Sequence, residues 1–308
     1  MIDTTKGSVL QKRRMRRLSN HVTIVAWSIF RYALLLGLSF VILYPLLYML
    51  SMAFRPAEQI YDASVIWVPK SLTIENIKNA WELMNYNNTL ITTLYVNVVS
   101  SLLQIITCAV TGYGFARFSF KGKNLCFLLV VLMVLVPSQI IAMPMFLTFK
   151  TLALLDTYWT FYLPAIFGAG IKSGLFIFIF RQFFRGLPKE LEDAAAIDGC
   201  GFVGCFIRIV VPNAATVFVM ASLLSIMWYW NDVFTSSMFL TNLETVTVAL
   251  SHLSGRATLL TGGATADPYQ IITLMQAGSL LCIFPLLLLY LFLQRYFVQG
   301  VERSGIVG

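Results

Sequence analysis

The chain has 308 residues, of which 58% are hydrophobic and 12% charged, with a mean hydropathy of +0.78 and a net charge of +8. A soluble domain is about half apolar and about a quarter charged, so the composition excludes soluble, disordered and disulfide-stapled proteins. It predicts an all-α, polytopic membrane protein, and a charge this modest gives no reason to expect a nucleic-acid partner.

Six stretches are long and apolar enough to cross a membrane, because a span needs roughly 20 mostly apolar residues. In chain order they are Arg31–Phe54, Thr89–Phe118, Leu125–Thr148, Tyr158–Phe180, Ile209–Trp230 and Ile272–Gln294. They predict a basic N-terminal segment, 1–30, a domain of six transmembrane helices, 31–300, and a tail, 301–308. Between the first two spans, Ile77–Met84 has helical periodicity and is expected to form a short helix on the membrane surface.

The distribution of Lys and Arg predicts the orientation of these spans. With the N-terminus in the cytoplasm, 16 of these residues fall inside and five outside, while Lys172 lies within the fourth span. Membrane proteins carry such an excess of positive charge in their cytoplasmic loops. We therefore expect a multi-pass protein of the cytoplasmic membrane with both termini in the cytoplasm. The basic stretch Lys12–Arg17 is expected to contact anionic lipid of the bilayer.

The inventory of reactive side chains argues against an enzyme. The two histidines, His21 and His252, lie near opposite ends of the chain, and Cys200 and Cys205 do not have the spacing of a metal site. The chain also lacks a phosphate-binding Gly-rich loop ending in Lys-Ser or Lys-Thr. We expect no cofactor bound by this chain, and if ATP drives its function, a partner supplies the ATP site.

The polar segment Arg181–Arg208 joins the fourth and fifth spans and predicts two short helices that meet at Gly199. Pro188 suits a first helical turn, acidic residues favour the positive end of the helix dipole, and glycine commonly ends a helix. Phe202, with Phe206 and Ile209, is expected to form one face of the second helix. By its residues alone this segment is either a protruding helix pair whose small-residue face binds another protein or a simple surface turn.

The pattern Pro188-x-Glu190-x-x-Asp193-Ala194-Ala195-x-x-Asp198-Gly199 resembles the EAA motif of ABC importer permeases. The resemblance implies that the segment is a cytoplasmic coupling-helix pair that docks in a cleft of an ATPase. The residues that would make this contact are Glu190, Glu192, Asp193, Ala194, Ala195, Asp198 and Gly199. Asp193 stands where the family has Glu, so the neighbouring Glu192 could take over a contact specific to Glu.

Further stretches extend the resemblance over the whole chain. They are Tyr113–Phe118, Val136–Gln139 with Pro144, Trp230–Asp232 and Gln294–Gly300. They are most similar to maltose-type (MalG-like) carbohydrate permeases. That resemblance implies a permease for a sugar, in particular an oligosaccharide. The implied partners are a second permease subunit (MalF-like), two copies of a cytoplasmic ATPase that bind ATP and Mg, and an extracytoplasmic sugar-binding protein. It also implies that the tail, Ser304–Gly308, reaches the ATPase dimer.

Polar side chains within the spans are candidates for the translocation pathway, because they are costly in lipid. The candidates are Asn97, Gln104, Ser138, Gln139, Asn231 and Gln276. Asn97 and Gln104 belong to a stripe that could serve helix–helix hydrogen bonds or line a pathway. Ser138 and Gln139 lie between Pro137 and Pro144, which break the helical ladder. Asn231 follows three aromatic residues that could bind sugar or form an interfacial aromatic belt.

Two other classes of function remain as alternatives. A stand-alone, ion-coupled secondary transporter of small polar solutes would carry buried acidic residues and often inverted repeats. The expected spans have no Asp or Glu in their interiors, and no repeat is visible. A membrane scaffold without a transport role would not need helices broken at Pro137, Pro144 and Pro164.

Overall fold

The computed structural model describes the backbone of residues 3–62, 68–260 and 267–305, and the side chains of residues 23–62, 68–259 and 267–294. Every regular element in these ranges is a helix. The longer ones are α1 (Asp3–Ala53), α2 (Glu75–Leu83), α3 (Tyr86–Leu94), α4 (Ser100–Arg117), α5 (Lys123–Leu135), α6 (Ser138–Thr151), α7 (Trp159–Ile166), α8 (Ser173–Gly186), α9 (Glu190–Ile197), α12 (Ala215–Trp230), α14 (Val246–Leu260) and α15 (Pro268–Gly305). Short helical pieces link them: η1 (Ala57–Gln59), η2 (Tyr95–Val99), α10 (Phe202–Cys205), η3 (Phe206–Val210), α11 (Val211–Asn213) and α13 (Phe234–Phe239).

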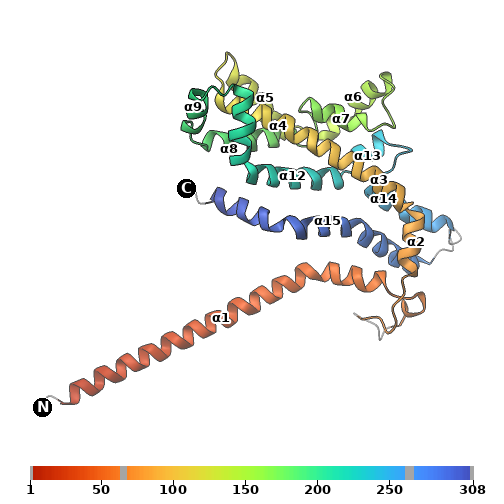
Figure 1. Cartoon of the computed structure of the whole chain (residues 1–308). Coiled ribbons are helices and arrows are strands. Elements are labelled where there is room, and N and C mark those ends of the chain that lie inside the picture. Colours follow the sequence, from red (N-terminus) through yellow and green to blue (C-terminus); the bar gives the residue numbers. More distant parts are fainter. Residues whose placement is uncertain (1–2, 63–67, 261–266, 306–308) are drawn as a thin grey trace.

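The helices form a bundle from which α1 projects (Figure 1). α4 packs against α8 and α12, and α15 packs against α1, α2, α12 and α14. The start of α1, the end of α15 and α9 lie toward the left of Figure 1, whereas α2 and α14 lie at the opposite end of the bundle. α1 is one continuous helix, so the backbone does not separate the expected N-terminal segment from the first span.

The expected count of six spans is not confirmed. Three helices in the described ranges are long and apolar enough to cross a membrane: Thr23–Ala53, Tyr86–Arg117 and Pro268–Gln294. Two further pairs of helices reach that length only as bent spans, α5 with α6 at 99° and Phe202–Asn213 with α12 at 80°. The structure therefore contains three to five candidate spans.

Local backbone chemistry explains why the remaining spans are broken. Pro137 has no amide hydrogen and disfavours helical geometry in Val136, whose ψ is 118°. In the expected fourth span, Gly168 and Lys172 have φ of +68° and +59°. These left-handed conformations interrupt the helix between the end of α7 and the start of α8. Pro137 and Gly168 are visible in the sequence, but a hydropathy average over about 20 residues does not register single helix-breaking residues.

The core between α4 and α8 depends on close backbone approach. Phe176, Phe180 and Phe184 of α8 are fully buried, and a Cβ added to Gly112 of α4 would lie 2.7 Å from Phe180 Cβ and 3.0 Å from the Arg181 backbone nitrogen. Small residues at such crossings allow two helices to pack tightly.

We expect Gly112→Ala to destabilise the protein by about 1 to 3 kcal/mol, the usual cost of overpacking a core. Gly114→Ala is the matched control, since a Cβ at this position of α4 meets nothing within 4 Å and Ala is the better helix former. Thermal unfolding of the two purified variants checks this expectation. Equal melting temperatures would show that α4 and α8 are free to separate.

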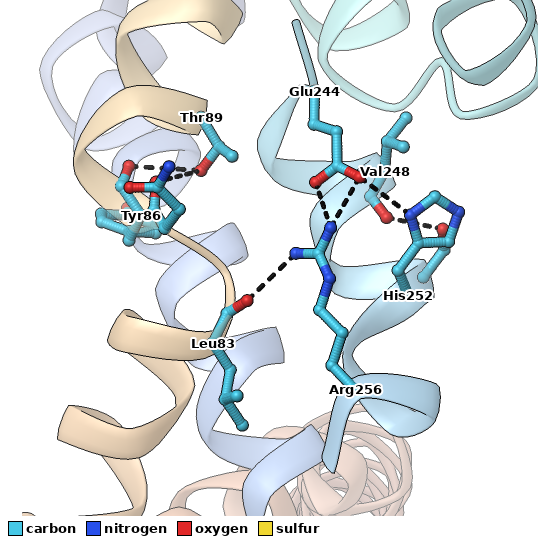
Figure 2. A network of polar contacts seen from close by, with 9 residues as sticks. Leu83, Tyr86, Thr89, Glu244, Val248, His252 and Arg256 are labelled. Carbon is cyan, nitrogen blue, oxygen red and sulfur yellow. Dashed lines mark hydrogen bonds and ion pairs between the residues drawn. The ribbon is translucent and has the colours of Figure 1, made fainter. Parts of the chain in front are cut away.

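The end of the bundle opposite α9 is held by a charged network (Figure 2). Arg256 of α14 donates from Nη2 to both carboxylate oxygens of Glu244, each at 2.6 Å, and from Nη1 to the Leu83 carbonyl at the end of α2, at 3.0 Å. His252 Nδ1 lies 3.1 Å from Glu244 Oε1. The network therefore joins α14 to α2, an element more than 150 residues away in the chain.

This network predicts a loss of stability in acid. Burial raises the pKa of Glu244, but the hydrogen bonds from Arg256 and His252 outweigh burial and hold the pKa below its usual value. A carboxylate with a depressed pKa stabilises the fold above its unfolded pKa of about 4.3 and ceases to do so as pH falls through the folded value. We expect the amides of α14 to lose protection against hydrogen exchange, relative to their intrinsic exchange rates, as the pH falls through the depressed pKa of Glu244. Glu244→Gln should remove this acid step, and a step that persists in the variant would assign it to another group.

Candidate functional site

The first candidate site is the segment that follows α8. α9 ends at Ile197, Asp198 is its C-cap, Gly199 has a φ of +80°, and α10 begins at Phe202. The two short helices and the left-handed glycine between them agree with the sequence prediction. Pro188 lies two residues before α9 rather than in its first turn.

Glu192 ties this segment to the end of α4. Arg117 Nε donates to Glu192 Oε1 at 2.6 Å, and the Tyr113 hydroxyl donates to Oε2 at 2.9 Å. Arg117 also donates from Nη2 to the Leu187 carbonyl at 3.0 Å. The side chains of Arg117 and Glu192 are 8% and 17% exposed, so the pair is well shielded from solvent. Glu192 therefore anchors α9 to the bundle, and its carboxylate is not free for a partner.

Aromatic rings support the inner side of the same segment. The Tyr113 ring packs against the rings of Phe206, at 4.9 Å between centroids, and Phe184, at 5.8 Å. Ala195 and Cys205 are buried in the same cluster. The sequence predicted that Phe202, Phe206 and Ile209 form one face of the second helix. Phe206 and Ile209 pack against the buried cluster, but Phe202 is 74% exposed, so the prediction is wrong for Phe202. The Phe202 ring lies at the edge of the cluster, where it packs edge-on against Phe118 with 5.4 Å between ring centroids.

The outer side of the helix pair presents apolar side chains to solvent. We call this surface the helix-pair patch; it consists of Leu191, Ile197, Phe202 and Val203, with Ile197 87% exposed. Glu190, Asp193, Ala194, Asp198 and Gly199 are also exposed beside it. Exposed apolar residues rimmed by charges mark surfaces that contact another protein or a membrane.

The polar stripe of α4 and η2 serves contacts between helices. Gln104 is fully buried, donates to the Ile171 carbonyl at 2.6 Å and to Ser173 Oγ at 3.0 Å, and accepts from Ser225 at 3.2 Å. Asn97 donates to the Ile226 carbonyl at 2.9 Å. Of the two interpretations of this stripe, the geometry favours helix–helix hydrogen bonding over a pathway wall.

A cavity of about 530 Å³ lies where the broken helices meet. Ser138 and residues of α5, α7 and the break before α8 line it, together with Tyr229 and Asp232 near the end of α12. Lys172, expected in the middle of an intact span, instead lies in this break and lines the cavity. Breaks of this kind are tolerated inside membranes where the backbone lines a cavity or is buried in protein.

The remaining pathway candidates are dispersed. Gln139 is exposed next to Ser138 at the start of α6, and Gln276 is half-buried in α15. Asn231 donates back to the Met227 carbonyl of its own helix at 2.8 Å. The carboxylate of the next residue, Asp232, accepts from the backbone amides of Thr235 and Ser236 and so caps α13.

Sequence reasoning did not assign roles to Tyr113 and Arg117. Both lie in the stretch that supported the family resemblance, at the end of the second span. An Arg at the last turn of a span, facing an acidic loop, was the available signal. Only the folded chain pairs it with Glu192, 75 residues away.

Comparison with known proteins gives the family. Residues 104–303, more than half of the chain, match the family described as "Binding-protein-dependent transport system inner membrane component". The chain is 32% identical to the arabinooligosaccharides transport system permease protein AraQ of Halalkalibacterium halodurans, over 88% of this chain and 93% of that protein. It is 29% identical to the maltodextrin transport system permease protein MdxG of Bacillus subtilis, over 90% and 95% of the two chains.

A solved structure supports the same fold. One chain of a bacterial ABC transporter involved in the import of the acidic polysaccharide alginate superposes with a TM-score of 0.73 at 19% identity, covering 88% of this chain and 96% of that chain. The chain therefore belongs to the family of binding-protein-dependent inner-membrane transport components, the permease subunits of ABC importers, whose ATPase is a separate partner.

Proposed function

We propose that this permease moves a carbohydrate, in particular an oligosaccharide, across the cytoplasmic membrane into the cell. The helix-pair patch is the observation that carries the coupling part of this proposal, because it presents apolar side chains on a segment anchored to the bundle. The carbohydrate part rests on the relatives, whose names specify arabinooligosaccharides and maltodextrin.

The proposed topology has six spans, two of them bent and the fourth built from α7 and α8. Both termini and the helix pair face the cytoplasm, in agreement with the excess of Lys and Arg on that side. The common side of α9 and the chain ends in Figure 1 supports this arrangement.

The proposed assembly pairs this chain with a second permease, two cytoplasmic ATPases that bind ATP and Mg, and an extracytoplasmic sugar-binding protein. The ATPase contacts would come from the patch and its neighbours: Glu190, Asp193, Ala194, Ala195, Asp198 and Gly199. Ala195 is itself buried, so it would shape this surface from beneath.

The anchor of α9 suggests how motion reaches the spans. The ion pair of Glu192 with Arg117 and the rings around Tyr113 make the helix pair move with α4 and α8. When the ATPases close on ATP, displacement of the patch would shift these helices and change which side the cavity opens to. The chain would thus be an element with two conformations, biased by binding to a partner.

The pathway is proposed to run through the cavity at the broken helices. Ser138 lines it, and Gln139 is adjacent to Ser138. Asn231 and Gln276 remain pathway predictions outside this cavity. Asn97 and Gln104 would support the wall through their bonds to α12 and to the start of α8.

The test is purification of the tagged chain from its native cell in mild detergent, followed by mass spectrometry and transport in liposomes. We expect an ATPase, a second permease and a sugar-binding protein to copurify, and uptake to require ATP. The binding protein is then screened with oligosaccharides, monosaccharides and amino acids. Uptake by the chain alone without ATP would indicate a secondary transporter instead, and a binding protein that prefers amino acids would overturn the carbohydrate assignment.

A further inference from the structure

The helices α5, α8 and α9 lie close together at one end of the bundle (Figure 1), and on or next to them are four basic residues that are near one another in charge interactions. Lys123 begins α5, Arg181 and Arg185 lie one turn apart on α8, and Lys189 is the N-cap of α9. Lys123 experiences the positive charges of the other three, which places all four within electrostatic range. Arg181 and Arg185, one turn apart on the same helix, repel each other, so the cluster favours binding of an anion.

Ion pairs within the chain do not supply that anion. The four ion pairs in the described part of the chain involve other basic residues. Lys123 donates to the Phe118 carbonyl at 2.7 Å, which leaves its charge uncompensated. Three acidic residues lie in the first turn of α9. Glu192 is already bound by Arg117 and Tyr113, while Glu190 and Asp193 take part in none of the four ion pairs.

Arg181 is held in a fixed orientation within this cluster. Its guanidinium carbon lies 3.8 Å from the centroid of the Phe127 ring of α5, a contact that favours a cation over an aromatic face. Its Nε is buried and has no hydrogen-bond partner in the structure. An oriented guanidinium with donors left over is suited to a phosphate or carboxylate.

The apolar surface beside the cluster narrows the choice of anion. Leu125, Leu128 and Leu129, on the turns of α5 next to Lys123, are 63%, 52% and 56% exposed. The cluster thus lies where an apolar, membrane-length helix pair begins, the depth at which lipid headgroups meet acyl chains. A free phosphate would use the charges but not this apolar face.

We propose that Lys123, Arg181, Arg185 and Lys189 form a binding site for the phosphate headgroup of an anionic phospholipid whose acyl chains lie along α5. Phosphatidylglycerol and cardiolipin carry the required headgroup chemistry, and basic pockets between membrane helices bind such lipids. The inference is independent of the transported substrate. It also differs from the contact expected for the basic N-terminal tail, which lies on another helix.

The experiment is a lipid titration of the purified transporter complex, followed by native mass spectrometry. The probes are phosphatidylglycerol, phosphatidylcholine with the same acyl chains, and inorganic phosphate. Arg185 and Lys189 are exposed, so the double variant Arg185→Gln/Lys189→Gln should fold. Lys121→Gln is the matched control, because Lys121 lies in the same turn as Lys123 but is not among the charges that act on it.

We expect saturable binding of phosphatidylglycerol to the wild-type complex and to Lys121→Gln. Binding to the double variant should be weaker by about fivefold per charge, or about twenty-fivefold in all. Phosphatidylcholine should bind no better to the wild type than to the variant. Equal phosphatidylglycerol affinity in all three proteins would overturn the site, and competition by inorganic phosphate at equal concentration would overturn the lipid as its ligand. A double variant that keeps the lipid but loses the ATPase would assign the cluster to protein contact instead.

Discussion

Gly199→Asp is expected to leave the protein in the membrane while ATP hydrolysis becomes uncoupled from uptake. Gly199 is exposed next to the helix-pair patch, and a Cβ there meets nothing within 4 Å of the chain itself. The folded subunit therefore has room for the side chain, whereas a docked ATPase would meet an added carboxylate at the point of close approach. Disruption at the centre of an interface typically costs about 2 kcal/mol or more, so uptake should fall by about thirtyfold or more.

Backbone strain has to be separated from the effect on docking. Gly199 has a φ of +80°, and a residue with a side chain pays roughly 1 to 2 kcal/mol in that region. Gly122→Asp is the matched control, since Gly122 has a φ of +82°, also meets nothing within 4 Å, and lies outside the helix pair. Gly199→Asn is a second control, because Asn tolerates the left-handed region and adds similar bulk without charge.

Uptake of labelled sugar and ATPase activity in the same proteoliposomes measure the coupling. We expect Gly122→Asp to transport normally and Gly199→Asn to fall between Gly199→Asp and the wild type. Normal transport by Gly199→Asp would remove the docking role of the segment. An equal loss in Gly122→Asp would assign the effect to backbone strain.

Glu192→Ala is expected to have the second large effect, through the anchor rather than the patch. Removing the carboxylate leaves the Arg117 guanidinium, in a side chain that is 8% exposed, without its charged partner. Breaking a buried pair in this way costs about 3 to 5 kcal/mol, and we expect the lower end of that range because Glu192 is partly exposed. The helix pair should then move independently of α4, so that ATPase binding persists while transport is lost.

A double-mutant cycle with Arg117→Ala isolates the pair from other effects. The double variant should be less destabilised than the sum of the two single variants, because neither charge is left alone. Glu190→Ala, an exposed carboxylate on the same helix, is the control for stability. If Glu190→Ala and Glu192→Ala melt at the same temperature, the anchor makes no contribution to the fold.

These two variants address different steps of one proposed mechanism. Gly199→Asp should reduce the association of the ATPase with the transporter, whereas Glu192→Ala should preserve association and reduce transmission to the spans. Copurification of the ATPase with each variant therefore distinguishes them. A loss of association in both would mean that the anchor also shapes the docking surface.

Local signals in the sequence were sufficient for the class of protein and for the helix pair. The scarcity of charge determined a membrane protein, because lipid excludes unpaired charges. The acidic and alanine-rich run from Glu190 to Ile197 forms α9, and Gly199 ends it in a left-handed conformation. Each of these features depends on neighbours within a few residues, so the linear chain contains the information.

Contacts between distant residues were decided by the tertiary structure. The sequence could not assign Glu192 to Arg117, Gln104 to Ser225, or Arg256 to Glu244 and Leu83, since each pairing requires the packed arrangement of several helices. The break at Pro137 was predicted from the sequence, but the breaks expected at Pro144 and Pro164 are wrong, because α6 and α7 continue through these residues. The break at Lys172 was visible only in the folded chain. Apolar composition alone determined that these segments belong in a membrane, whereas their bends and polar contacts follow from backbone sterics and from hydrogen bonds that only the folded chain brings together.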